Sequence, residues 1–241
     1  MGQVFRELWY LARRSHLYTA KVRRLRQAKR LLPKRSGWVI DIGAGSQPYR
    51  FYLAQDVRYV AMEYSPNPLC QVRGSILDLP FSQEVFDGAI CTEVLEHVPE
   101  PSRALQNVNR ILRVGGWLYL TVPMTWGLHY EPRDYFRFTK YGLTYLVERS
   151  GFEIVEIARI GGLFTTLLAR LEEVGVSLLY RLAFPLKFLI GSSNRVLLIS
   201  LVVFPVIVPL DLLASLLDLL VPGSDKDAMG WAVLAVKRGN E

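Results

Sequence analysis

Short apolar runs alternate with longer helical patterns through the middle of the chain. The apolar runs have the length and composition of buried strands, and they cover residues 37–42, 57–62, 70–74, 87–91 and 116–122. The clearest helical pattern between them runs from about Pro101 to Leu112 and ends before the pair Gly115-Gly116. Strands that alternate with helices in this way predict a doubly wound α/β sheet that is mostly parallel.

Two later segments are expected to form a sixth and a seventh strand. Residues 152–159 show the apolar–polar alternation of a half-buried strand, and residues 230–237 form an apolar run that also looks like a strand. About 70 residues separate them and are strongly apolar: residues 196–210 carry no charge, and from there to residue 221 only Asp211 and Asp218 do. This stretch is therefore an insertion between the two strands, and it is much more apolar than the segments that connect the other strands.

The first predicted strand runs directly into a glycine-rich turn, Asp41-Ile42-Gly43-Ala44-Gly45. Gly43 and Gly45 have no Cβ, so backbone N–H groups can approach a bound ligand closely. Glu63 ends the second strand, 22 residues after Asp41, where an acidic side chain can accept both hydroxyls of a ribose. Pro48 stands where a dinucleotide-binding turn has its third glycine. The spacing fits a dinucleotide or an S-adenosylmethionine cofactor.

Four motifs decide between these two cofactors. They are DIGAG at residues 41–45, GSILDLPF at 74–81, FDGAICTEVLEHV at 86–98 and LRVGGWLYL at 112–120. In order and spacing they resemble the class I S-adenosylmethionine-dependent methyltransferases, in the type 11-like branch, over about residues 38–157. The resemblance implies an enzyme with a Rossmann-like methyltransferase sheet, an antiparallel hairpin of strands six and seven at its edge, and S-adenosyl-L-methionine as cofactor.

The resemblance also assigns cofactor-binding residues. It puts Asp41 near the amino-acid part of the cofactor, Gly43 and Gly45 beneath it, and Glu63 on the ribose. Thr92 lies at the carboxyl end of the fourth strand, on the same edge.

The adenine pocket departs from the family pattern. Ser75 stands where the family commonly has an acidic residue. Three alternatives therefore stay open for the exocyclic amine of adenine: Asp78, the hydroxyl of Ser75, or backbone groups at Ile76.

The acceptor is expected to meet the segment HYEPRDYFRFT at residues 129–139, which precedes a helix at 140–150 that Thr139 can cap. It is similar to a block in methyltransferases of surface-polysaccharide and lipid-linked sugar pathways. His129 is the candidate base, since imidazole titrates near neutral pH. Arg133 and Arg137 would orient an anionic acceptor. Tyr130 and Asp134 complete the substrate-binding set, and salt-bridged loop packing is the alternative for the whole block.

His97 follows the fourth strand in the turn at residues 93–97. We expect a hydrogen-bonded histidine that holds the loop, with a place in the cleft as the alternative. The sequence predicts no metal site.

Positive charge is concentrated at the start of the chain. Residues 1–35 hold eleven Lys or Arg against one acid, Glu7, a local charge of +10, while the whole chain carries +7. The segment can form one or two helices that end before Pro33. A solvated lid helix, a face for anionic lipid or a phosphate-bearing substrate, and a nucleic-acid surface are the three interpretations, of which nucleic acid is the least favoured because aromatics are absent from residues 21–35.

The apolar insertion raises the question of a membrane. Residues 196–221 are long enough to span one only if Asp211 is tolerated. If strands six and seven share one cytosolic sheet, the insertion must leave and return on one side, which excludes a single crossing. In-plane helices or a re-entrant hairpin broken at Pro205 and Pro209 remain. The alternative is a soluble helical pair, buried on the sheet or in a dimer.

These observations predict three segments: a basic helical segment at 1–35, a methyltransferase domain formed by 36–160 and 229–241, and an apolar insertion at 161–228. The expected function is methyl transfer to an O or N nucleophile of a lipid-linked, glycan or otherwise amphiphilic acceptor. The expected location is the cytoplasmic face of a membrane, peripheral or monotopic. The alternatives are an RNA or soluble small-molecule methyltransferase, and a non-catalytic cofactor-binding membrane protein.

Overall fold

The computed structural model describes residues 18–182, 192–221 and 225–239. Residues 1–17, which carry part of the predicted basic segment, lie outside them. The chain divides into two compact units, one formed by Met1–Leu25 and Ile160–Met229, the other by Arg26–Arg159 and Gly230–Glu241.

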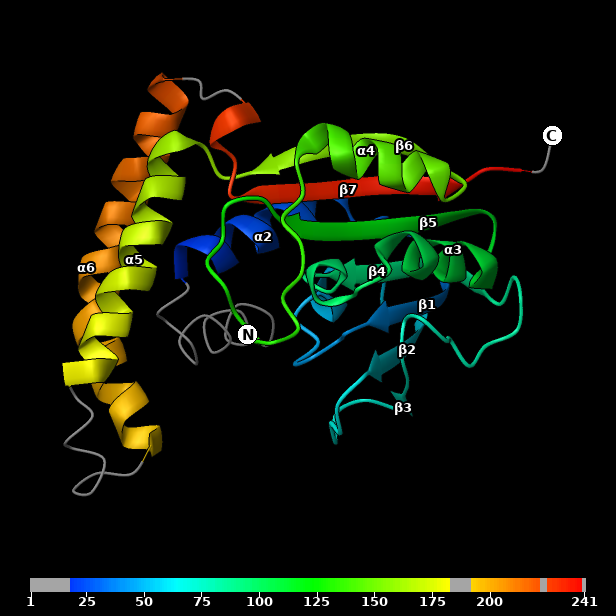
Figure 1. The fold of residues 1–241 in the computed structure, drawn as a ribbon, viewed down its shortest axis with the longest axis horizontal. Helices are drawn as coiled ribbons and strands as arrows, with labels where there is room; N and C mark the ends of the chain where they lie inside the picture. The colour runs from blue at the N-terminus through cyan, green and yellow to red at the C-terminus, as the bar shows by residue number, and fades with distance from the viewer. Residues whose placement is uncertain (1–17, 183–191, 222–224, 240–241) are drawn as a thin grey trace. The chain divides into compact units, whose positions relative to one another are not determined.

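The second unit is built on a seven-stranded sheet with the order β3-β2-β1-β4-β5-β7-β6 (Figure 1). Its strands are β1 (Gly37–Ile42), β2 (Val57–Glu63), β3 (Val72–Arg73), β4 (Phe86–Thr92), β5 (Leu112–Pro123), β6 (Phe152–Ile160) and β7 (Gly230–Lys237). β1 pairs in parallel with β2 and β4, and β5 pairs in parallel with β4 but antiparallel with β7. This confirms the predicted doubly wound sheet with an antiparallel edge. The strand order reverses between β1 and β4, where ligands bind in such sheets.

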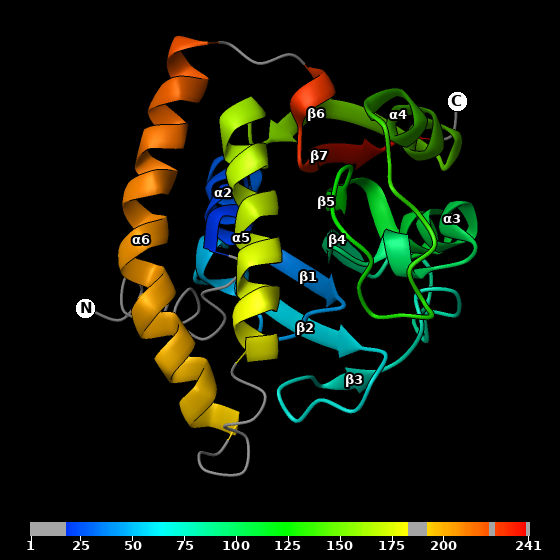
Figure 2. The same ribbon diagram turned by 60° about the vertical axis from the view of Figure 1, so that its left-hand side comes forward.

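The two long helices of this unit begin and end where the sequence signals them. They are α3 (Pro101–Ile111) and α4 (Lys140–Arg149), which lie on the same face of the sheet (Figures 1 and 2). The Thr139 hydroxyl accepts a hydrogen bond from the backbone N–H of Gly142 and caps α4. Three short 3-10 helices complete the assigned helical turns of the described residues: η2 (Arg50–Tyr52), η3 (Leu95–His97) and η5 (Asp225–Asp227).

Two boundaries differ from the prediction. β3 is only two residues long, because it pairs with just the last two residues of β2. The Gly115-Gly116 pair lies inside β5 instead of before it: Leu112 pairs with Phe86 and Trp117 with Gly88, so β5 carries a bulge between these pairs. Gly115 has φ +74, which is favourable for glycine, and the bulge is the reason that β5 begins earlier than expected.

The first unit is a helical assembly. It contains α5 (Leu163–Leu182), α6 (Ser192–Leu220) and the first eight residues of α2 (Tyr18–Leu31). Leu168, Ile207 and Ala214 form a small apolar cluster between these helices. Arg23 of α2 forms a buried salt bridge of 2.8 Å with Asp211 of α6. Asp211, one of the two acids that interrupt the apolar insertion, is therefore paired within the protein.

The basic segment is only partly a solvated face. Lys21 and Arg23 are buried, at 4% and 5% exposure, and Arg30 pairs with Glu156 of β6. Lys21 and Arg23 are thus removed from the cationic surface that the sequence suggested, while Arg30 stays exposed but is paired with an acid. None of the helices among the described residues has the length and the apolar character needed to cross a bilayer.

Candidate active site at the carboxyl ends of the strands

The glycine turn after β1 is closed by hydrogen bonds to β2. The backbone N–H groups of Gly43 and Ala44 donate to the carbonyl of Met62, at 2.9 and 3.1 Å. Gly43 has φ +72, and a Cβ added there would stand 2.4 Å from Cγ2 of Val94. A Cβ added to Gly45, with φ +50, would find its nearest neighbour only at 4.0 Å. The turn is thus packed beneath Gly43 and open beside Gly45, a cradle that a ligand can approach.

Glu63 lies at this turn, as the sequence predicts. Its Oε2 accepts a hydrogen bond from the backbone N–H of Gly45 at 3.1 Å, and its Oε1 accepts one from the N–H of Tyr64 at 2.9 Å. The side-chain amide of Asn67 donates to the carbonyl of Gly45 at 2.8 Å and fixes the turn from the other side. The half-buried carboxylate therefore stands beside the open face of Gly45.

Asp41 lies beneath the turn in a buried position. Its Oδ2 accepts a hydrogen bond from the hydroxyl of Tyr59 at 2.5 Å, while its Oδ1 has no hydrogen-bond partner among the described residues. Burial raises the pKa of the Asp41 carboxyl to about 7, against the lowering effect of the Tyr59 hydrogen bond. A buried carboxylate oxygen without a partner fits a site that expects a polar or cationic group.

The residues predicted around adenine form a tight turn. The N–H of Asp78 donates to the carbonyl of Ser75 at 3.0 Å, and the Ser75 hydroxyl accepts from the N–H of Leu77 at 3.2 Å. The carbonyl of Ile76 accepts from the side chain of Asn107 of α3 at 3.1 Å. Ser75 thus holds the turn, and the three alternatives for the adenine contact stay open. Thr92 is nearly buried at the end of β4, opposite Thr121 of β5.

Arg137 and Asp134 hold the loop at residues 124–139 together. Arg137 donates to both carboxylate oxygens of Asp134, at 2.7 and 2.8 Å. It also donates to the carbonyls of Trp126, Gly127 and Phe136. These contacts use all five guanidinium donors.

The hydrogen bonds from Arg137 hold the pKa of Asp134 far below its usual range. In this arrangement Arg137 has no guanidinium N–H left for the predicted contact with a methyl acceptor. Salt-bridged loop packing, the alternative that the sequence left open, describes this pair.

The other predicted acceptor residues lie in the same loop. Tyr130 is exposed, and the Arg133 guanidinium lies over the ring of Tyr64, 5.1 Å from its centre. Because Tyr64 follows Glu63, this contact joins the loop to the carboxyl end of β2. At its other end the N–H of Phe138 donates to the carbonyl of Pro123. The loop thus runs along the edge where the glycine turn lies.

His97 and His129 meet in this loop. Nδ1 of His97 lies 2.6 Å from the carbonyl oxygen of Arg133, which is the loop-holding hydrogen bond that the sequence predicts. Burial lowers the pKa of His97. Nδ1 of His129 lies 3.0 Å from the carbonyl oxygen of Gly127, and the two imidazole rings stand edge to face at 4.7 Å. The sequence patterns do not identify Glu96, which is fully buried beside the two histidines, as a site residue. They do not identify Tyr59 or Tyr64 either.

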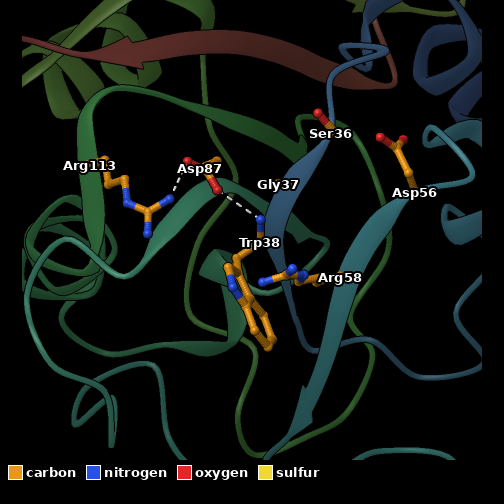
Figure 3. A pocket seen from close by; sticks show the side chains of 7 residues that line it. All are labelled: Ser36, Gly37, Trp38, Asp56, Arg58, Asp87 and Arg113. Atoms are coloured by element: carbon orange, nitrogen blue, oxygen red, sulfur yellow. Dashed lines mark hydrogen bonds and ion pairs between the residues drawn. The ribbon is translucent and has the colours of Figure 1, made fainter.

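A pocket lies at the opposite end of the strands (Figure 3). It is lined by Ser36, Gly37, Trp38, Asp56, Arg58, Asp87 and Arg113. Asp87 accepts hydrogen bonds from Arg113 at 2.5 Å and from the N–H of Trp38 at 2.8 Å. Since ligands of doubly wound sheets bind at the carboxyl ends of the strands, this pocket is separate from the cofactor site.

The strand order, the reversal between β1 and β4 and the acid beside the glycine turn define a Rossmann-like nucleotide-cofactor domain. Comparison with known proteins makes this more specific. Residues 40–120 match the family model described as "Methyltransferase domain". In rice, 2-methyl-6-phytyl-1,4-hydroquinone methyltransferase 2 is 25% identical over 150 residues, which cover 51% of this chain and 41% of the rice protein. The chain thus matches less than half the length of that relative.

Solved structures share the fold. The [4+2]-cyclase SpnF superposes with a TM-score of 0.57 at 17% identity, covering 92% of this chain and 81% of SpnF. The N1-methyltransferase of 1,6-didemethyltoxoflavin from Burkholderia thailandensis, which contains S-adenosylhomocysteine, superposes with a TM-score of 0.52 at 16% identity, covering 97% and 82%. With the motifs and the family match, the domain belongs to the class I S-adenosylmethionine-dependent methyltransferases, and S-adenosylmethionine is its cofactor, as predicted.

The site fits this cofactor. The open face of Gly45 admits a ligand, the Glu63 carboxylate stands next to it, and a buried oxygen of Asp41 has no partner.

Proposed function

We propose that the chain transfers a methyl group from S-adenosylmethionine to an O or N nucleophile of an amphiphilic small molecule at a membrane surface. The observation that supports an enzyme is the hydrogen bond from the N–H of Gly45 to the carboxylate of Glu63. This contact holds the carboxylate on the open side of the glycine turn, where it can accept hydrogen bonds from the ribose hydroxyls. When bound, the cofactor supplies a methyl group already activated on a sulfonium. The protein then has to align the nucleophile and to remove its proton.

The residues around the turn hold the cofactor in this proposal. Glu63 accepts the ribose hydroxyls, and Gly43 and Gly45 let the backbone approach the amino-acid part. The unpartnered oxygen of Asp41 acts from below. The turn at residues 75–78 bounds the adenine, with Thr92 at the end of β4.

His129 takes the proton of a hydroxyl or ammonium acceptor. Its Nδ1 faces the carbonyl of Gly127, which can only accept a hydrogen bond, so Nδ1 carries the hydrogen and Nε2 keeps its lone pair. Arg133 and Tyr130 stand on the exposed side of the same loop and are the groups that orient the acceptor. Arg137 and Asp134 position this loop without touching the acceptor.

The amphiphilic acceptor is inferred from the helical unit and from relatives. Large apolar side chains are exposed on α5 and α6: Leu167, Leu171, Val174, Leu178, Val206, Leu210, Leu212, Leu213, Leu216, Leu219 and Leu220. Such a surface suits helices that lie in the plane of a membrane interface. The rice relative is named for a hydroquinone that carries a phytyl group, and a relative from Nitrosomonas europaea, 34% identical over 50 residues that cover 21% of this chain and 19% of that protein, is named for ubiquinone biosynthesis. A location on the cytoplasmic membrane face is part of the proposal.

Labelled cofactor tests this function. Purified protein, with methyl-labelled S-adenosylmethionine, is offered membrane lipid extract, RNA and a polar glycan extract in separate reactions. The expected result is label in the organic phase of the lipid reaction. This label should be lost in the His129→Ala variant but kept in Glu153→Gln, at an exposed position of β6. Label in RNA alone, or in no fraction despite cofactor binding, would overturn the acceptor class.

A further inference from the structure

An acid and two imidazoles converge where η3 meets the loop at residues 124–139. One ligand atom each of Glu96, His97 and His129 lies within 4.8 Å of the others. Oε1 of Glu96 is 3.8 Å from Nε2 of His97. A ligand–ion bond of about 2.0–2.2 Å puts two ligand atoms about 3–4 Å apart. The distance between Glu96 and His97 already fits a shared ion, and a small side-chain movement brings the third ligand atom into range.

Backbone carbonyls set the tautomer of both histidines. Nδ1 of His97 faces the carbonyl of Arg133 at 2.6 Å, and Nδ1 of His129 faces that of Gly127 at 3.0 Å. A carbonyl can only accept, so each Nδ1 carries the hydrogen and each Nε2 presents a lone pair. Metal-binding histidines almost always donate their second N–H to a carbonyl or carboxylate in this way.

The loop is fastened so that the three side chains stay together. The N–H groups of Tyr135 and Phe136 both donate to the carbonyl of Glu96, at 2.8 and 3.3 Å. Asp134 accepts a hydrogen bond from the N–H of His129 at 2.8 Å and pairs with Arg137 at 2.7 Å. The cluster is therefore anchored through the main chain of both segments that supply it.

The local charge favours a dication. The carboxylates of Glu93, Glu96 and Asp134 all act on the guanidinium of Arg137. When Glu96 is ionised and the imidazoles are neutral, these three carboxylates outnumber the one guanidinium and leave the cluster in negatively charged surroundings. Oxygens of Asp134 lie 3.9 and 3.5 Å from Nδ1 of His97 and His129, so part of this negative charge stands directly behind both ligands. Glu96 is fully buried, where a carboxylate is expensive unless a positive charge accompanies it.

We propose that Glu96, His97 and His129 bind a divalent first-row transition ion, such as Zn²⁺ or Mn²⁺. Two imidazoles and one carboxylate suit such ions, while Mg²⁺ and Ca²⁺ prefer oxygen ligands. Three protein ligands leave coordination positions open for water or a substrate oxygen. The sequence alone predicts no metal site, because the ligands of the proposed site come from two segments that lie 32 residues apart in the chain.

The role of the ion rests on the proposed function. Val94, three residues before His97, packs on Gly43 of the cofactor turn, so η3 joins the two sites. An acceptor hydroxyl on the ion would have a lowered pKa and would release its proton to water before its oxygen attacks the methyl carbon. With the ion present, Nε2 of His129 is a ligand, and the ion replaces His129 in activating the hydroxyl.

Direct ion binding tests the site without turnover. The full chain is stripped with EDTA and titrated with Zn²⁺ by calorimetry and with Co²⁺ by visible absorption. We expect one ion per chain, visible Co²⁺ bands, and little competition from millimolar Mg²⁺. Glu96→Gln, His97→Gln and His129→Gln should each weaken Zn²⁺ binding at least about tenfold. Glu153→Gln, which removes an exposed carboxylate far along the sequence on β6, should bind as the parent does.

S-adenosylhomocysteine binding separates the possible failures. A variant at one of the three ligands that still binds S-adenosylhomocysteine is folded, so its weaker Zn²⁺ binding results from the lost ligand. If a glutamine variant fails this check, His97→Ala or Glu96→Ala replaces it. Absence of stoichiometric Zn²⁺ binding by the parent, or equal affinity in all three variants, would overturn the metal site. A parent that binds Zn²⁺ but no S-adenosylhomocysteine would overturn the proposed function and leave the metal site standing.

Discussion

Asp41 should make the protein less stable as the pH rises through neutrality. Burial raises the pKa of its carboxyl from 3.8 to about 7, so folding favours the protonated form. The stabilising contribution is fully present below the unfolded pKa and is lost as the pH approaches the folded one. A difference of about 3 pKa units corresponds to about 4 kcal/mol in all, of which about 3 kcal/mol falls between pH 4.5 and pH 8.

The substitution Asp41→Asn isolates this effect. Asparagine keeps the shape and an oxygen that accepts from Tyr59, but it cannot ionise. Urea unfolding of the cofactor-free protein from pH 4.5 to 8 gives the difference in unfolding free energy between variant and parent. This difference should shift by about 3 kcal/mol in favour of the variant as the pH rises, and Asp56→Asn, at an exposed aspartate, is the matched control. A difference that stays constant with pH would refute the reasoning.

Three further substitutions test other parts of the structure. Gly43→Ala drives a Cβ into Val94 at φ +72, so we expect lower thermal stability in calorimetry and at least tenfold weaker S-adenosylhomocysteine binding; unchanged values for both would contradict the packed turn. Asp211→Asn leaves Arg23 charged and buried, and urea unfolding should show a loss of about 3–5 kcal/mol, whereas a loss below 1 kcal/mol would contradict the pairing. Arg137→Lys cannot reproduce five hydrogen bonds, so turnover should fall while S-adenosylhomocysteine affinity stays within threefold; full turnover would contradict its positioning role.

The sheet could be predicted because its information is local. Each central strand is a short apolar run, and turn residues mark its ends, so β1, β2, β4 and β7 lie within one residue of the expected ranges. The cofactor turn was equally accessible, since Gly43, Gly45 and Glu63 belong to a βαβ unit of fixed spacing. β5 began earlier than expected because a bulge at Gly115 is invisible to periodicity.

Long-range partners set the limit of the sequence analysis. The buried Asp211 is explained by Arg23, 188 residues away, and no local pattern contains that pair. Arg137 has the side chain of an anion-binding residue, and only the loop conformation shows that its donors are already used. Glu96 and His129 likewise meet only after the loop folds back onto η3.

Calorimetric titration with S-adenosylhomocysteine tests the cofactor site most directly. The parent protein should bind one molecule per chain, Glu63→Gln should bind at least about tenfold more weakly through the loss of charged hydrogen bonds to the ribose, and Glu153→Gln should match the parent. Absence of binding heat from the parent at several temperatures, or equal affinity in the Glu63 variant, would contradict a nucleoside held at the end of β2.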